Sequence, residues 1–111
     1  MALKPALDTA GLLPEPSPEE LSLESVLQAL GDAVRLQIVR QLHQAPDVKA
    51  CGTFELPIGK STASHHFKVL REAGVIRQRV DGRRRLTSLR EAELEERFPG
   101  LLASVLAGAG R

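Results

Sequence analysis

Two adjoining stretches decide the fold of this chain: KSTASHHFKVLREAGVI, residues 60–76, and RQRVDGRRRLTSL, residues 77–89. The first predicts a helix over residues 60–73, which Gly74 ends in a left-handed turn. One face of this helix is apolar at helical spacing and carries Ala63, Phe67 and Leu70. The other faces are polar or basic, so we expect the helix to pack on a core with one side only.

A β-hairpin is predicted to follow this helix. Residues 75–80 form its first strand, Asp81-Gly82 its two-residue type I′ turn, and residues 83–89 its second strand. This turn places Arg79 opposite Arg84 on one side of the hairpin. Like charges side by side repel each other. Such a tip is therefore expected where an anion is usually bound.

Two helices are predicted upstream of residue 60. The first begins at Ser17-Pro18-Glu19-Glu20, which has the pattern of a capping box, and ends at Gly31. Asp32 caps the second helix, residues 33–44. Residues 47–58 indicate a short helix or a turn and are the least clear part of the chain.

A further helical segment is predicted near the C-terminus, where Ser88 to Glu91 gives an S-x-x-E cap and Pro99 interrupts the helix. The order helix, helix, short helix, helix, hairpin, helix is that of a winged helix-turn-helix domain, a mainly α fold with a small β-hairpin. We expect this domain to span residues 17–107, between a flexible N-terminal arm at residues 1–16 and a frayed tail at residues 108–111.

Composition limits the function classes. The chain has 111 residues, 42% of them hydrophobic and only 3% aromatic, so an aromatic platform for stacking RNA bases is not expected. One cysteine excludes a disulfide framework within the chain. Because no apolar run approaches the length of a membrane-spanning helix, we expect a soluble cytoplasmic protein.

The charges are divided unevenly along the chain. Residues 59–90 hold nine Lys or Arg and two acidic residues, a balance of +7, and the remainder has a balance of −6. A basic region of this kind favours a polyanion on one face of the molecule. The plainer alternative is a solvated, arginine-rich surface.

A helix with short polar side chains at its N-terminal end fits the major groove of DNA. We expect the DNA contacts of this helix to come from Lys60, Ser61, Thr62, Ser64, His65, His66, Lys68 and Arg71. The hairpin, or wing, would contact phosphates or the minor groove through Arg77, Arg79, Arg83, Arg84 and Arg85. In the alternative interpretation Ser61 only caps the helix, and His66 is a packed or phosphate-contacting histidine and does not contact bases.

Residues 60–89, together with LQALGDAVRLQIVRQL at residues 27–42, resemble the ArsR/SmtB-type bacterial transcriptional regulators. The resemblance covers residues 21–90 and implies a sequence-specific regulator that binds a palindromic operator as a homodimer. Repression is the default for this regulator, and activation is the alternative. On the basis of the resemblance the dimer interface would contain Leu23, Val26, Leu27, Leu30, Leu94, Phe98, Leu101, Leu102 and Val105. Alternatively, these residues belong to the core of a single chain.

The metal sites of that family are not recovered by motif. Only Cys51 stands near the position of the thiolate site, and the C-terminal helix has no histidine. The weak candidates for metal ligands are His43, Cys51, His65 and His66, and they could act only after folding or dimerisation. No cofactor is required, and a nickel or zinc effector remains an open alternative.

Two other function classes are a protein-docking module and an enzyme. A winged helix can serve as a docking module, in which case the basic face would bind an acidic protein. An enzyme is not expected, because the sequence offers no nucleophile with a base and orienter, no phosphate-binding glycine loop and no paired acid and base. Ser64 beside His65 is adjacency on a helix and not a catalytic dyad.

Overall fold

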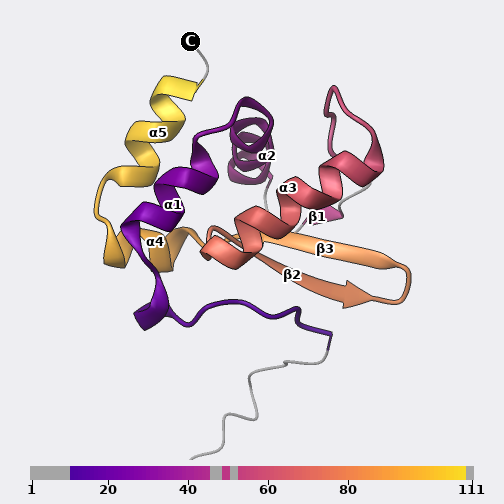
Figure 1. Ribbon diagram of the computed structural model, residues 1–111, viewed down its shortest axis with the longest axis horizontal. Coiled ribbons are helices and arrows are strands. Elements are labelled where there is room, and N and C mark those ends of the chain that lie inside the picture. The colour runs from indigo at the N-terminus through magenta and orange to yellow at the C-terminus, as the bar shows by residue number, and fades with distance from the viewer. Residues whose placement is uncertain (1–10, 46–48, 51–52, 110–111) are drawn as a thin grey trace, which may run out of the picture.

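The computed structural model describes residues 11–45, 49–50 and 53–109, and Figure 1 shows how its elements are arranged. The helices α1, α2 and α3 precede a hairpin of strands β2 and β3, and two short helices, α4 and α5, follow it. A two-strand hairpin set beside a helix-turn-helix is the predicted winged helix-turn-helix fold. The bounds of the helices are Pro18–Glu20 for the 3-10 helix η1, Leu23–Leu30 for α1, Ala33–Gln44 for α2, Lys60–Ala73 for α3, Glu91–Arg97 for α4 and Leu101–Ala109 for α5.

The predicted first helix is in fact two elements. Ser17 and Glu20 form the expected capping box, with Ser17 N–H donating to Glu20 Oε1 at 2.8 Å, but the helix they begin is only the 3-10 turn η1. Leu21 then takes an extended backbone and is buried in the core. Ser22 restarts the helix by accepting a 3.1 Å hydrogen bond from the Ser25 N–H, so burial of Leu21 causes the break.

The two helices of the helix-turn-helix have the predicted bounds. Asp32 caps α2 by accepting hydrogen bonds from the backbone N–H groups of Val34 and Arg35. Gly59 is the N-cap of α3, so the interpretation of Ser61 as the cap is wrong. Gly74 ends α3 at φ +87°, in the left-handed region that glycine enters without strain.

The sheet contains three strands in the order β1-β3-β2, all antiparallel: Lys49–Ala50 (β1), Arg84–Leu89 (β3) and Ile76–Asp81 (β2). The predicted short helix or turn at residues 47–58 is therefore wrong at Lys49–Ala50, which pairs with β3 through Thr87 and Leu86.

The turn of the hairpin lies one residue later than predicted, so each residue of β2 pairs with a residue of β3 two positions further along. Asp81 pairs with Arg84, so the turn is Gly82-Arg83 and not Asp81-Gly82. Gly82 has φ +64° and no other residue type in the described part has a positive φ, which is the pattern of a type II′ turn. Arg79 lies opposite Leu86, and the predicted repulsion between Arg79 and Arg84 as direct partners is wrong.

The C-terminal segment is split near Pro99, as predicted, into α4 and α5. The predicted cap at Ser88 is wrong, because Ser88 lies in β3 and Arg90 is the N-cap of α4. Helix α5 continues to Ala109, so the residues 108–109 predicted to fray are helical.

The N-terminal segment was predicted to be a loose arm over residues 1–16, and this is wrong for residues 11–16. Leu12 forms a bridge with Arg79, and Leu13 N–H donates to the Gln78 carbonyl at 2.9 Å. Residues 1–10 of the predicted arm lie outside the described residues.

The core is mostly aliphatic, with Phe67 as its buried aromatic residue, and lies where α1, α2 and α3 meet the base of the hairpin and helices α4 and α5. Four of the residues predicted for a dimer interface are part of this core: Val26, Leu30, Leu94 and Leu102, which are 1%, 4%, 2% and 6% exposed. For these the alternative interpretation as intramolecular core is correct. No helix in the described part of the chain is long and apolar enough to cross a membrane.

Candidate nucleic-acid interface

The N-terminal half of α3 presents its polar side chains to solvent. The exposed residues of this half are Lys60, Ser61, Thr62, Ser64 and His65, and Lys68 is exposed further along the helix. Ser64 Oγ donates a 3.1 Å hydrogen bond to the carbonyl of Lys60, which leaves the lone pairs of its hydroxyl able to accept from a ligand. The predicted side chains therefore stand where a groove of DNA could receive them.

The opposite face of α3 fixes the direction of the helix. Phe67, Leu70 and Ala73 are buried, and the Phe67 ring packs edge-on against Phe54 with 5.1 Å between centroids. Because the face is held by the core, α3 cannot rotate about its axis without exposing apolar area. The polar face of α3 therefore has one fixed direction relative to the rest of the domain.

The tip of the wing is exposed and basic. Arg83, Arg84 and Arg85 are exposed, and Arg79 is half-buried. Arg84 Nη2 lies 3.1 Å from Asp81 Oδ2, across the turn. An ion pair this exposed is weak, so the guanidinium can exchange Asp81 for a phosphate at little cost.

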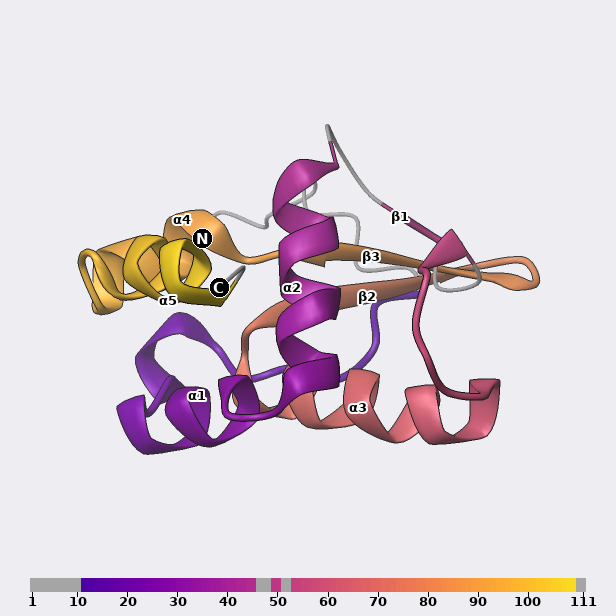
Figure 2. The ribbon, with the colours of Figure 1, turned by 90° about the horizontal axis from the view of Figure 1, so that it is seen from above.

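The N-terminal half of α3, the helix that we call the recognition helix, and the tip of the wing lie at the same end of the molecule. Both views place the N-terminal end of α3 and the turn of the hairpin at one end, with α1, α4 and α5 at the other (Figures 1 and 2). A single duplex could therefore contact both elements at once.

His66 is a packed histidine, as the alternative interpretation held, and not a residue that faces a ligand. Its side chain is 13% exposed, and Nδ1 lies 3.1 Å from Arg35 Nη1 and 3.7 Å from Asp32 Oδ2. A guanidinium nitrogen can only donate, so Nδ1 accepts this hydrogen bond. His66 thus connects α3 to the start of α2.

Two of the predicted DNA-contacting arginines are used inside the molecule. Arg71 donates from Nε to the Pro14 carbonyl at 3.2 Å and from Nη1 to Gln78 Oε1 at 2.8 Å. Arg77 donates to Glu15 from Nε and Nη2, the shorter distance being 2.7 Å. Both guanidinium groups therefore have partners within the protein, and the Arg77 side chain is still 40% exposed, so their contacts with DNA stay predictions.

Ion pairs and caps shift the pKa values of several side chains around these elements. The hydrogen bond from Arg90 lowers the pKa of Glu93, and the hydrogen bond to Glu15 raises the pKa of Arg77. The Arg35 backbone N–H lowers the pKa of Asp32. All three groups are thus held in their charged forms at neutral pH.

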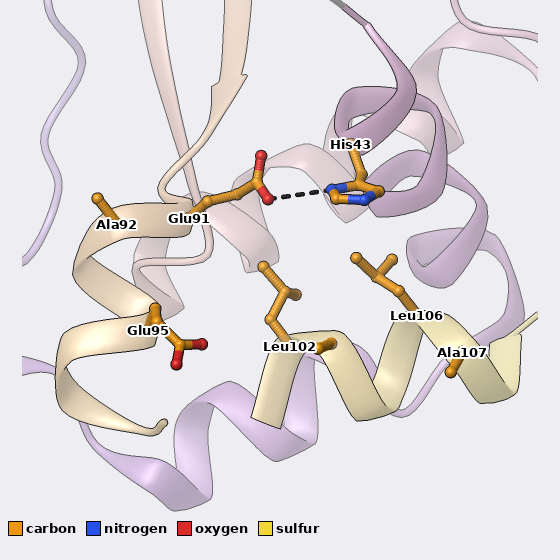
Figure 3. Close-up of a pocket in the computed structure, with 8 residues that line it drawn as sticks. His43, Glu91, Ala92, Glu95, Leu102, Leu106 and Ala107 are labelled. Carbon is orange, nitrogen blue, oxygen red and sulfur yellow. Dashed lines mark hydrogen bonds and ion pairs between the residues drawn. The ribbon is translucent and has the colours of Figure 1, made fainter. Parts of the chain in front are cut away.

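The candidate metal ligands that the structure describes do not form a group of three or more. His43 Nδ1 lies 3.0 Å from Glu91 Oε1, at the edge of a hollow of about 800 Å³ between α2, α4 and α5, above Leu102 and Leu106 (Figure 3). Cys51 lies outside the described residues. Among the residues that are described, no group of three or more His, Cys, Asp or Glu could hold a metal ion. These residues do not fit a transition-metal site.

Sequence analysis missed the residues that hold the N-terminal segment, above all Glu15 and Arg90. The Arg90 side chain is 1% exposed, and its Nε donates to Glu93 at 2.7 Å. A signal was present in the alternation of Pro14, Pro16 and Pro18, because closely spaced prolines favour an extended backbone that can lie along a sheet edge.

Comparison with known proteins agrees with this geometry. The model of the bacterial regulatory protein arsR family matches residues 32–78. The chain is 40% identical over 82 residues to the uncharacterized HTH-type transcriptional regulator YceK of Bacillus subtilis (strain 168). The aligned residues make up 72% of this chain and 82% of that protein. It is 33% identical over 58 residues, 51% of this chain and 65% of the relative, to the uncharacterized HTH-type transcriptional regulator MJ1325 of Methanocaldococcus jannaschii.

The match to the Bacillus subtilis regulator extends over most of both chains, and the family match includes α2, α3 and the start of β2. The exposed helix and basic wing described above are the parts that such a domain uses to bind DNA. This chain belongs to the ArsR family of helix-turn-helix transcription regulators, which are DNA-binding proteins and not enzymes.

Proposed function

We propose that the protein is a homodimeric, sequence-specific repressor that binds a palindromic operator. The observation that carries the proposal is the exposed polar half of α3 beside an arginine-rich wing at one end of the molecule. In this arrangement Ser61, Ser64 and His65 contact base edges in the major groove. Lys68 and the wing arginines contact phosphates, which supply most of the affinity.

Dimerisation is supported by apolar side chains at the opposite end of the molecule. Leu23 and Leu27 on α1 are 43% and 46% exposed, which is unusual for leucines one helical turn apart. Leu101 and Val105 on α5 are only partly buried against the core. A two-fold axis through this end would direct two α3 helices outward to symmetric half-sites, and a palindrome matches that symmetry.

We do not include a metal effector in this proposal. The described residues do not fit a transition-metal site, and Glu91 already pairs with His43. The nickel or zinc effector kept open as an alternative therefore has no support from the described part of the chain.

The test is selection of bound duplexes from a random pool, followed by measurement of affinity against salt. We expect an enriched palindrome whose half-sites are about 10 base pairs apart, centre to centre. The logarithm of affinity should fall steeply with the logarithm of salt concentration, as several neutralised phosphates require. With the operator placed over a promoter, added protein should lower transcription in vitro.

Three results would contradict separate parts of this proposal. A pool that remains random after selection at low salt excludes specific DNA binding and favours a protein-docking module. An enriched single half-site, together with sedimentation as one chain, excludes the dimer. Transcription that rises when protein is added excludes repression and leaves activation.

A further inference from the structure

The N-terminal segment, residues 11–21, lies across the wing, the recognition helix and α4, and we call it the strap. Figure 1 shows it running beneath β2 before it turns up into α1. Arginine side chains from four different parts of the fold contact it: Arg71 on α3, Arg77 on β2, Arg90 before α4 and Arg97 on α4. The strap is therefore the one described segment that contacts all of these parts through arginines.

The carbonyl groups of alternate prolines accept three of these contacts. The donors and distances are Arg71 Nε to Pro14 at 3.2 Å, Arg90 Nη1 to Pro16 at 2.8 Å, and Arg97 Nη1 to Pro18 at 2.9 Å. Prolines have no N–H to donate to a sheet, so the segment cannot continue as a regular strand. The guanidinium groups satisfy carbonyls that a neighbouring strand would otherwise pair.

Glu15 lies between these carbonyls and neutralises the arginines beneath the strap. Its side chain is 13% exposed, and its two oxygens accept from Arg77 at 3.0 Å (Nε to Oε1) and 2.7 Å (Nη2 to Oε2). Arg90 Nη1 lies 3.8 Å from the same carboxylate. Glu93 Oε1 accepts from both arginines, at 2.7 Å from Arg90 and 3.3 Å from Arg77. Bidentate pairing of this kind fixes orientation as well as charge.

The first residues of the strap pair with the outer edge of β2, close to the tip of the wing. Val80 N–H donates to the Gly11 carbonyl at 2.7 Å, and Leu13 N–H donates to the Gln78 carbonyl at 2.9 Å. Gly11 has φ +76°, and a Cβ there would collide with the Val80 carbonyl. Only glycine permits this close approach without strain. The strap thus holds the wing at one end and α4 at the other.

We propose that the strap is a positioning element for DNA recognition and that Glu15 is its main positioning residue. Arg71 is the connection to α3, because it donates both to the strap at Pro14 and to the wing at Gln78. With the strap docked, the recognition helix and the wing keep one fixed relation. Hydrogen bonds to base edges require a well-defined orientation of α3 relative to the wing. Contacts with phosphates tolerate more variation in that orientation. This inference rests on the proposed DNA-binding function.

The substitution Glu15→Gln tests the proposal, with Glu19→Gln as its control. Both variants remove one negative charge from the strap, and Glu19 is exposed on η1. The loss of this charge alone tightens binding to any duplex. We expect the control to show only this effect. In Glu15→Gln we expect affinity for the selected operator to fall about tenfold, the size of a typical coupling between sites, while affinity for random duplex stays equal or rises.

Hydrogen exchange at the Val80 amide gives a second readout that does not involve DNA. Because this amide donates to Gly11, its exchange should be faster in Glu15→Gln than in the wild type. If Glu15→Gln does not fold, Gly11→Ala is the second variant, because it releases only the first residue of the strap. It should also speed exchange at the Val80 amide. The operator-to-random affinity ratio should fall in this variant as well.

The outcomes separate this inference from the proposed function. If the wild type discriminates operator from random duplex and both strap variants keep that ratio, the inference is overturned and the proposed function stands. Faster exchange at Val80 with an unchanged ratio also overturns it, since the strap is then structural only. If the wild type itself does not discriminate, the proposed function fails, and the role of the strap in recognition fails with it.

Discussion

Arg71 on the recognition helix donates a 2.8 Å hydrogen bond from Nη1 to Oε1 of Gln78, a fully buried side chain on the first strand of the wing. Gln78 in turn donates from Nε2 to Thr87 Oγ1, at 3.3 Å, on the second strand. The polar chain Arg71-Gln78-Thr87 therefore connects α3 to both strands of the hairpin. Burial of a glutamine side chain costs free energy of folding unless its amide is hydrogen-bonded. Gln78 therefore needs Arg71 and Thr87 as partners, and each of them loses a hydrogen bond without Gln78.

Replacement of Gln78 by alanine should lower the stability of the whole domain. The variant leaves Thr87 and Arg71 each without one buried partner and removes side-chain volume, so we expect the free energy of unfolding to fall by about 2 kcal/mol. Urea unfolding monitored by circular dichroism measures this change. Gln44→Ala, at an exposed position at the end of α2, is the control and should change stability by less than about 0.5 kcal/mol. Equal stabilities of the two variants would show that the polar chain is not needed.

The exposed residues of α3 and of the wing should affect DNA binding in different ways. His65→Ala removes the proposed base contact, so we expect operator affinity to fall by about 1 to 3 kcal/mol with little change for random duplex. Arg83→Ala removes the proposed phosphate contact, so both affinities should fall together and the salt slope should decrease by about 1. Fluorescence anisotropy over a salt series measures all four affinities. The assignment is wrong if Arg83→Ala changes discrimination more than His65→Ala does.

The bounds of α2 and α3 could be predicted because local signals fix both ends. Asp32 accepts from the first N–H groups of α2, and Gly74 adopts the left-handed conformation after α3. The exposure of the polar half of α3 also followed from its single apolar face. Each of these features depends on residues within about one turn of one another, and such information is contained in a short stretch of sequence.

The register of the hairpin could not be predicted from its turn residues. Asp81-Gly82 is a common type I′ pair, and the interpretation of it as the turn sets Gln78 opposite Arg85. In the structure Gln78 lies opposite Thr87 instead, and both side chains are buried and hydrogen-bonded to each other. Moving the turn by one residue shifts every cross-strand partner by two residues, and burial of polar pairs decides between the alternatives. That burial depends on how α3 covers the sheet.

The strap escaped prediction because its contacts are distant in sequence. Glu15 pairs with Arg77, 62 residues away, and the Pro16 carbonyl with Arg90, 74 residues away. The segment has no apolar period, which is the primary signal for an ordered element. The same long-range pairing gives Arg71 and Arg77 partners within the protein, and nothing in their local sequence distinguishes them from the exposed arginines at the tip.

Leu27 provides a test of the proposed dimer. The side chain is 46% exposed on α1, so Leu27→Glu places a charge on the surface of one chain but inside an interface between two. We expect the variant to sediment as a single chain and to bind the operator at least about tenfold more weakly, because two half-sites no longer bind together. Analytical ultracentrifugation at several concentrations gives the oligomeric state.

The control for this prediction is Glu24→Gln, an exposed change on the same helix. It should sediment like the wild type and should not weaken operator binding, because the loss of one surface carboxylate only favours a polyanion. A Leu27→Glu protein that still sediments as a dimer would place the interface elsewhere on the chain.

Asp32 should make the stability of α2 sensitive to acid. Its Oδ2 accepts from the Val34 and Arg35 N–H groups at 3.0 and 3.1 Å, and the second of these hydrogen bonds is the main cause of its lowered pKa. A carboxyl whose pKa is lower in the folded state than in the unfolded state adds stability above the unfolded value, and this contribution is lost as the pH falls through the folded value. Asp32→Ala should therefore cost about 1 kcal/mol at pH 7, as the loss of an N-cap does.

Asp32→Asn separates the charge from the cap, because the amide oxygen still accepts from the backbone while the side chain no longer titrates. We expect the difference in free energy of unfolding between wild type and Asp32→Asn to stay constant from pH 7 to about pH 5. Below about pH 4, where the carboxyl of the unfolded chain takes up its proton, the difference should shrink as the folded carboxyl is protonated in turn. Urea unfolding at each pH measures the two free energies. A difference that is the same at pH 3 and pH 7 would mean that the charge of Asp32 contributes nothing to the folded state, and that its hydrogen bonds to the first turn of α2 act through the cap geometry alone.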